Sequence, residues 1–239
     1  MGEDLECISD NLGLFSKLET TTNQINQLDL TLQGFGVHAI YEPQYQTVYF
    51  TFLNQNNSED NFTLSYNEKL QAFESFYSFK PKLYFRLDNK LFSSNNVSCY
   101  WHNKGNYGEF YGVYYPSLIK LLTNENPTIT KVWDNQQFQT EIYDTNGLLL
   151  NLDTIDFIQH TTENQDTGVI TLIPQTNINK VEKDWKLQIQ RDLANATYST
   201  LSKPRLRDLY LQTQITFSNE NNKRFILHPI TTFYRQSIH

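Results

Sequence analysis

The chain has 239 residues, enough to bury the core of one large β domain or of two small domains. Its formal net charge is −7 and no run of Lys or Arg exceeds two residues, which excludes the basic surface typical of nucleic-acid binders. Only 19% of the residues are charged and no apolar run reaches 18 residues, so no membrane partner is expected.

Residues 1–33 begin with acidic residues and continue as a stretch rich in Thr, Asn and Gln. Their apolar positions follow no clean helical period, and Gly13 interrupts them, so we expect an extended linking segment with at most a short helix. No charged-then-apolar leader is present, and Cys7 and Cys99 are far apart. We therefore expect two free thiols in a reducing compartment, the cytoplasm of the cell that makes the protein.

Residues 34–116 carry a series of aromatic strands. Apolar and polar residues alternate, which places Val48, Phe50 and Phe52 on one face of a strand. Turn residues at 42–44 and 67–69 divide the first half into four strands, the content of one β-propeller blade. The second half, with turns at 88–90 and 103–106, is predicted to form a second, degenerate unit of this kind.

Residues 117–239 are predicted to form a C-terminal β region. Its first segment, 117–124, fits either a short helix or a strand, whereas 129–134, 138–144 and 168–174 have strand patterns. The chain then ends in what we expect to be one long hairpin around the polar turn at 218–223. The fold class is all-β, with antiparallel sheets in propeller-blade-like or sandwich units and few short helices.

Catalytic motifs are absent from the sequence. The five histidines lie far apart, so no metal site is expected, and no serine motif or phosphate loop indicates a catalytic centre or a cofactor. A glycosidase could draw its two carboxyl groups from the acidic residues present, but nothing in their context selects a pair. These acidic residues are Glu68, Glu74, Glu109, Asp134, Asp144, Asp153 and Asp156.

Two groups of residues are candidate subunit contacts. Tyr100, Trp101 and Tyr107, with the neighbouring Phe110 and Tyr111, fit a stacking platform for sugars, an anchor for another subunit, or simply core. Arginines of the last hairpin are predicted to pair with carboxylates across subunits, and their natural complement is acidic. The arginines are Arg205, Arg207, Arg224 and Arg235; the acidic complement is Glu42, Glu59 and Asp60.

Several segments between residues 34 and 239 resemble the muzzle, or tail stabilization, proteins of crAss-like bacteriophages. They are FGVHAIYEPQYQTVYFTF, FTLSYNEKLQAFESFYSFKPKLYF, YWHNKGNYGEFYG and the terminal KPRLRDLYLQTQITFSN…FILHPITTFYRQS. Residues 1–33 contribute nothing to this resemblance. The resembling segments match the C-terminal portion of a longer protein.

The resemblance implies a structural virion protein of the distal tail that forms a ring, with six-fold symmetry expected, around the DNA channel. Its partners would be copies of itself, other tail proteins and the rest of a longer parent chain, without tight DNA binding. It would be made in the bacterial host cytoplasm and would not be an enzyme. Two alternatives stay open: a carbohydrate-binding or glycoside-cleaving β-propeller domain, and a secreted adhesion module.

Overall fold

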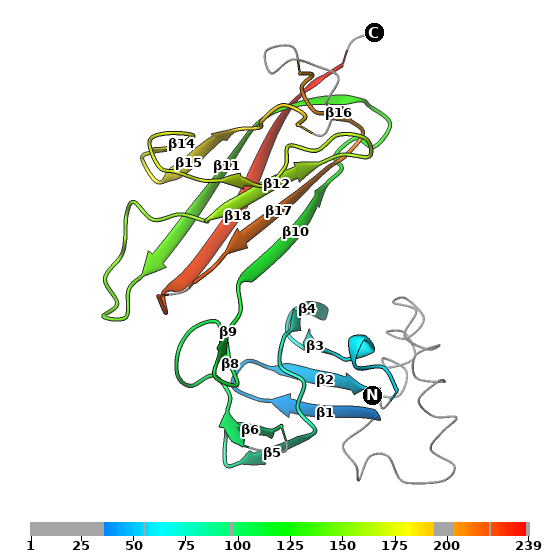
Figure 1. Ribbon diagram of the computed structural model, residues 1–239, viewed down its shortest axis with the longest axis vertical. Helices are drawn as coiled ribbons and strands as arrows, with labels where there is room; N and C mark the ends of the chain where they lie inside the picture. Colours follow the sequence, from blue (N-terminus) through cyan, green and yellow to red (C-terminus); the bar gives the residue numbers. More distant parts are fainter. Residues whose placement is uncertain (1–35, 55, 96–97, 194–202, 220, 238–239) are drawn as a thin grey trace. The chain divides into compact units, whose positions relative to one another are not determined.

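The computed structural model describes residues 36–54, 56–95, 98–193, 203–219 and 221–237. These residues form eighteen β-strands and one 3-10 helix, η1 (Ser58–Asp60), so the all-β prediction is confirmed (Figure 1). They group into two compact units. Unit 1 holds the described residues up to Gly105 together with Phe110–Val113, and unit 2 holds Asn106–Glu109 and the described residues from Tyr114 onward. The linking segment expected at residues 1–33 lies outside the described residues.

The first sheet of unit 1 is an antiparallel meander in the order β1-β2-β3-β4. Each strand pairs with the next along the chain, so three hairpins build the sheet. The expected four strands and their turns are confirmed. The strands are β1 (Gly36–Glu42), β2 (Thr47–Leu53), β3 (Phe62–Asn67) and β4 (Ala72–Tyr77).

The two faces of this meander carry different side chains. Phe50 lies opposite Leu64, and Phe52 opposite Phe62, so one face is apolar, as the alternation predicts. The other face carries Tyr49 and a row of buried hydroxyl side chains that includes Thr51. This hydroxyl-bearing face packs against rings of unit 1, because the Tyr49 ring lies 5.8 Å from that of Phe79 and Thr51 hydrogen-bonds Tyr84.

The rest of unit 1 is a three-stranded antiparallel sheet in the order β5-β6-β7. Its strands are β5 (Leu83–Leu87), β6 (Lys90–Ser94) and β7 (Cys99–Trp101), and the predicted turn at Asp88-Asn89 connects the first two. Cys99 is an exposed free thiol. A further two-stranded ribbon follows, and the division between the units falls within it; its strands are β8 (Glu109–Phe110) and β9 (Val113–Tyr114).

Unit 2 contains two antiparallel sheets. The first has the order β10-β17-β12-β13, with strands β10 (Ser117–Thr123), β12 (Phe157–Thr161), β13 (Ile170–Thr171) and β17 (Leu211–Phe217). The second is built around β11, which pairs with β15, β16 and β18. Its strands are β11 (Lys131–Tyr143), β14 (Ile178–Val181), β15 (Asp184–Gln188), β16 (Arg207–Asp208) and β18 (Arg224–Gln236).

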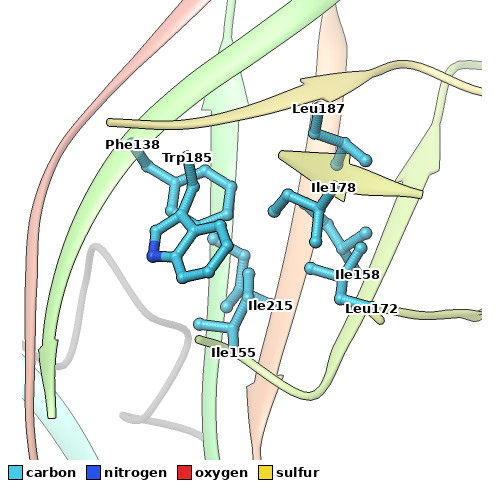
Figure 2. Close-up of a cluster of buried hydrophobic side chains, with 8 residues drawn as sticks. All are labelled: Phe138, Ile155, Ile158, Leu172, Ile178, Trp185, Leu187 and Ile215. Atoms are coloured by element: carbon cyan, nitrogen blue, oxygen red, sulfur yellow. The ribbon is translucent and has the colours of Figure 1, made fainter. Parts of the chain in front are cut away.

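The two sheets of unit 2 face each other across one apolar core (Figure 2). Phe138 and Trp185 come from the second sheet, whereas Ile158 and Ile215 come from the first, and all four are at most 2% exposed. Every second residue of β17 is buried, as expected for a strand with one face on a core. Unit 2 is therefore a β-sandwich.

The expected terminal hairpin is wrong. β17 pairs with β10 and β12 in one sheet, whereas β18 pairs with β11 in the other. The polar segment between β17 and β18 thus carries the chain from one sheet to the other, and the rings of Phe217 and Phe225 stack 4.4 Å apart at this crossing. Both strands gain a full partner and bury apolar residues in the same core, which a simple hairpin would not provide. Residues 117–123, left open between helix and strand, form β10.

Candidate assembly surface

Three of the four candidate arginines lie at one end of unit 2. Arg207 and Arg235 both lie opposite Val132, at the start of β11 and on its two sides. Arg205 joins them, and together the three arginines line one open cleft, with Val132, Gln165, Pro204, Gln236 and Ser237 as the other lining residues. We call this the arginine cleft.

Arg224 does not belong to this group. It lies opposite Tyr143 at the other end of the β11–β18 pair, with its guanidinium 5.7 Å from the centre of the Tyr143 ring. The predicted cluster of four is therefore wrong. The reason is that β18 is one continuous strand of 13 residues, with Arg224 at its start and Arg235 near its end.

Asp134 holds two of the three arginines in place. Arg235 donates from Nε to Oδ2 at 2.7 Å and from Nη2 to Oδ1 at 3.0 Å, and Arg205 donates from Nη1 to Oδ1. These hydrogen bonds raise the pKa of Arg235. Two guanidinium groups thus share one carboxylate within the chain, so the cleft keeps an excess of positive charge and a fixed geometry.

Lys131 fixes the loops next to this cleft. Its ammonium is fully buried and donates to the backbone carbonyl oxygens of Asn126, Ile129 and Leu209, at 3.0, 3.1 and 2.6 Å. Burial lowers the pKa of this side chain. Because the three carbonyls come from two segments far apart in sequence, the lysine ties together the entries into β11 and β17.

A second cleft shares Arg205 and extends the basic area. Arg191 and Lys203 also line it, and Arg191 donates to the backbone oxygen of Lys203 at 2.6 Å. The described lining of the two clefts contains five cationic side chains and no carboxylate. Sequence reasoning missed both residues: Lys203 lies two residues before Arg205 but was not grouped with it, and Arg191 is brought beside Arg205 by a β-bridge.

The candidate aromatic residues do not form one surface. Tyr100 is half-buried against Tyr111, with their rings 4.4 Å apart. Trp101 is 41% exposed, and the ammonium groups of Lys90 and Lys104 lie 4.6 and 5.6 Å from its ring centre. Tyr107 is exposed but belongs to unit 2, where its backbone N–H donates to Asn222 Oδ1 at 2.6 Å. The predicted platform is thus divided between the two units.

The acidic residues predicted to complement the arginines differ in their accessibility. Glu42 is buried, its Oε1 accepts from Asn103 Nδ2 at 2.7 Å, and burial raises the pKa of its carboxyl group. It cannot meet another subunit without unfolding part of unit 1. Glu59 is exposed and Asp60 half-buried in η1, where both can reach a partner.

One arrangement in unit 1 resembles a catalytic pair. Ser93 Oγ lies 2.6 Å from His102 Nε2 and 2.7 Å from Tyr111 Oη. However, Ser93 is 0% exposed, and burial lowers the pKa of His102 to about 4. A nucleophile has to reach its substrate, so this hydrogen-bonded triplet serves the core of unit 1.

Besides Asp134, several of the candidate glycosidase carboxylates are engaged within the chain. Asp153 pairs with Lys223 at 2.5 Å, Asp156 accepts from the backbone N–H of Ser218 at 2.7 Å, and Asp144 caps its own turn. The hydrogen bonds in this turn lower the pKa of Asp144, so this carboxyl group is a poor general acid. Among the described residues, no group of three His, Cys, Asp or Glu side chains could hold a metal ion. Nor do they include a helix long and apolar enough to cross a membrane.

The described part of the chain is thus an all-β protein whose unit 2 carries basic clefts, with Arg205 and Arg235 held by Asp134. Residues 1–97 match the family Crassvirus muzzle protein, and residues 105–192 match the Crassvirus muzzle protein C-terminal domain. The chain belongs to the Crassvirus muzzle protein family, and is thus a structural component of the tail of a crAss-like phage virion.

The two matches refine the resemblance seen in the sequence. The match begins at residue 1, so the expectation that residues 1–33 lie outside the resemblance is wrong. The change from one match to the other falls between residues 97 and 105, close to the division between units 1 and 2. No curated protein matches the chain.

Proposed function

We propose that copies of this chain form a closed ring around the DNA channel at the distal end of a short phage tail. Family membership supports the tail role, and the resemblance in sequence implies six-fold symmetry. The proposal also includes synthesis in the cytoplasm of the bacterial host, and contacts with other tail proteins and with the rest of a longer parent chain.

The arginine cleft is the observation that carries the contact between copies. Asp134 fixes Arg205 and Arg235, so the cleft receives an acidic group without having to order long side chains first. Glu59 and Asp60 supply such a group in unit 1. A contact from unit 1 of one copy to unit 2 of the next is head-to-tail, and head-to-tail contacts close into rings.

Charge reversal tests this contact. Arg207→Glu should reduce assembly about tenfold when the chain is produced with its neighbouring tail proteins and rings are counted by mass photometry. Lys183→Glu is the matched control, because Lys183 is exposed on the turn between β14 and β15, away from the cleft. Glu59→Lys combined with Asp60→Lys should restore assembly to the Arg207→Glu chain. If the Arg207→Glu and Lys183→Glu chains assemble equally well, the proposed contact at the arginine cleft is refuted.

We expect no tight DNA binding. A channel wall that held the genome by its phosphates would slow its passage, and the net charge of −7 opposes such binding. Duplex DNA should therefore show no micromolar affinity for the folded chain at physiological salt in a fluorescence anisotropy titration. Micromolar binding that falls steeply with salt would mean that the basic clefts face the channel.

Exposed Trp101 is the observation that favours the alternative of sugar binding. The two lysine ammonium groups near its ring compete with a sugar for that face. A glycan array therefore separates the two functions: the tail role predicts no signal, whereas binding that is lost in Trp101→Ala would support the alternative.

A further inference from the structure

Three aromatic side chains form a row across one face of the β5-β6-β7 sheet in unit 1. Phe85, Phe92 and Trp101 lie directly opposite one another on the three strands. The ring centres of Phe85 and Phe92 are 5.2 Å apart in a stacked pair, and those of Phe92 and Trp101 are 6.0 Å apart. Leu91 and Ser93, which point to the other face, are buried, so the row lies on the exposed face. We call this row the aromatic ladder.

The aromatic ladder belongs to a larger apolar patch. Phe85 and Trp101, at its two ends, are 38% and 41% exposed. Leu83 and Leu87 lie on either side of Phe85 along β5, on the same face of the strand, and are 56% and 62% exposed. Single exposed apolar residues are common on proteins, but a contiguous patch of this kind indicates a binding surface.

Two lysines add positive charge to one end of this patch. The ammonium groups of Lys90 and Lys104 lie 4.6 and 5.6 Å from the centre of the Trp101 ring. Among the described residues, neither ammonium group forms an ion pair with a carboxylate. A partner that covers this end of the patch should therefore bring a carboxylate to the lysines.

The stacking of the rings favours a protein partner over a sugar or a nucleic-acid base. Phe92 has another ring on each side, and Trp101 has Phe92 on one side and the lysine ammonium groups near its ring centre. Sugars and bases need open ring faces to stack on. The ring edges that remain suit edge-to-face contacts with the aromatic side chains of a protein.

Unit 1 contains both a basic and an acidic half. Residues 80–105, which include the aromatic ladder, hold five cationic residues and one carboxylate, Asp88, so their net charge is +4. Residues 36–79 hold five carboxylates and one cation, Lys69, so their net charge is −4. The cationic residues are Lys80, Lys82, Arg86, Lys90 and Lys104, and the carboxylates are Glu42, Glu59, Asp60, Glu68 and Glu74. Every copy therefore carries a basic region and an acidic complement to it.

The β4 edge of the acidic half carries the side chains that the patch requires. Among the described residues, β4 pairs with β3 alone. Phe73 and Phe76 point to the same face, opposite Tyr66 and Leu64, and are 39% and 67% exposed. Glu74 lies between these two rings, is exposed, and sits at a register shift that leaves it without an opposite residue in β3. This edge thus presents two aromatic rings and one carboxylate.

We infer that the aromatic ladder of one copy receives the β4 edge of a second copy, with Glu74 at the ammonium groups of Lys90 and Lys104. Phe73 and Phe76 then pack against the apolar patch. Both surfaces belong to unit 1 and remain exposed there, so they do not cover each other within one chain. This contact goes beyond the proposed ring, because it requires only two copies and neither ring closure nor the arginine cleft.

Chemical cross-linking of the full chain tests this contact. A carbodiimide condenses a carboxylate with an adjacent ammonium group, so it should join a peptide that contains Glu74 to one that contains Lys90 or Lys104. Unlabelled and isotope-labelled chains are mixed, and the cross-linked peptides are identified by mass spectrometry. Pairs of one labelled and one unlabelled peptide are expected, and Glu74→Gln should abolish them. Glu182, which is exposed in unit 2, is the internal control and should not be joined to these lysines.

Quenching of tryptophan fluorescence by acrylamide provides the second measurement. Trp133 and Trp185 are each 1% exposed, so the quenching reports mainly on Trp101. As copies associate with rising protein concentration, the quenching of Trp101 should fall by about half, because a ring at the centre of an interface loses its contact with water.

Charge reversal links this shielding of Trp101 to the proposed contact. Glu74→Lys should keep the quenching at its value in dilute solution, and so should Lys90→Glu combined with Lys104→Glu. An equal mixture of these two chains should restore the shielding, because opposite charges meet again. Glu182→Lys is the matched control and should behave like the unchanged chain.

Several results would overturn the second copy as the partner. They are the absence of cross-links at Glu74, cross-linked pairs in which both peptides always carry the same label, and shielding of Trp101 that survives Glu74→Lys. Shielding that appears only when neighbouring tail proteins are added would assign the patch to one of them instead. Arg207→Glu should leave the shielding unchanged, so failure of this contact and failure of the ring proposal can be told apart.

Discussion

Units 1 and 2 both bury polar side chains between their sheets, but different chemical groups form the hydrogen bonds at the two centres. In unit 1 the centre is made of hydroxyls: Thr51 Oγ1 lies 2.7 Å from Thr63 Oγ1 and 2.6 Å from Tyr84 Oη. In unit 2 the centre is an amide, since Gln136 Nε2 donates to Thr213 and Thr232 at 2.8 and 3.0 Å. We call these the hydroxyl centre and the amide centre.

The side chains around the two centres differ as well. Rings dominate in unit 1, where Tyr49, Phe79 and Tyr84 pack together with further aromatic residues. The core of unit 2 is mostly Ile and Leu around Trp185 and Phe138. The hydroxyls of the hydroxyl centre and the Gln136 side chain each have hydrogen-bond partners, whereas Trp133 Nε1 and His160 Nδ1 in unit 2 are buried without one. The comparison shows that a central hydrogen-bonded group can be built into either an aromatic or an aliphatic shell.

The largest effect should come from removing the central ring of unit 2. Trp185 is 1% exposed, and its Nε1 donates to Thr140 Oγ1 at 2.9 Å. Trp185→Ala should lower the free energy of unfolding by about 3–5 kcal/mol. Trp101→Ala, at an exposed position, is the control and should cost less than about 1 kcal/mol. In the Trp185→Ala chain, hydrogen exchange measured for each strand should show a larger loss of protection in β11 of unit 2 than in β2 of unit 1. An equal loss of protection in both strands would mean that the two units unfold together.

Acid should destabilise both units through one histidine in each. Burial lowers the pKa of His160 in unit 2 and of His102 in unit 1 to about 4, whereas an unfolded histidine titrates near 6.5. Between pH 6.5 and 4 the unfolded chain therefore binds protons that the folded chain does not. The free energy of unfolding should fall by up to about 1.4 kcal/mol per pH unit for each histidine, and the contribution is fully present above pH 6.5.

Urea denaturation at pH 7 and pH 5 measures this dependence. His160→Gln should weaken the pH dependence of the free energy of unfolding of unit 2, which contains β11, and leave that of unit 1, which contains β2, unchanged. His102→Gln should have the opposite effect. If neither substitution alters the dependence on pH, then carboxyl groups rather than these histidines govern the acid response.

Loss of the amide centre should have the next largest effect. Gln136→Ala removes the donor for both threonine hydroxyls and the acceptor Oε1, 2.8 Å from His160 Nε2. Orphaned buried polar groups cost about 1–3 kcal/mol. Chemical denaturation should show a loss of about 2 kcal/mol, and Asn135→Ala next to it, at an exposed position, is the control. A loss no larger than that of the control would mean that the amide centre adds no stability.

The smallest effect is expected at the hydroxyl centre. Thr51→Val keeps the shape of the side chain but removes one partner from Thr63 and from Tyr84. Thr63 keeps a second bond, to the Phe79 carbonyl oxygen at 2.6 Å, so the loss should be only about 1 kcal/mol by thermal denaturation. A loss larger than that of Gln136→Ala would reverse the order of the two centres.

Local signals in the sequence were sufficient for the elements and for many of the turns. Period-two alternation predicts the faces of β2, and short polar breaks predict the turns between β1 and β2 and between β5 and β6. The physical reason is that alternation and turn chemistry act over a few residues. The arginine cleft was predicted only in part. Its three arginines were among the residues selected from the sequence, but their arrangement around Asp134 and the separate position of Arg224 were not predicted.

Strand partners and the site were decided by the tertiary structure. β17 and β18 are close in sequence yet lie in different sheets, because β17 pairs along its whole length with β10, β18 pairs with β11, and both strands border a common core. Asp134 is 71 residues from Arg205 and 101 residues from Arg235, so no local pattern links them. The sequence by itself determined which residues form strands and which face is apolar. Which strands pair and which charges meet depended on burial over long distances along the chain, where alternation specifies a face but not a partner.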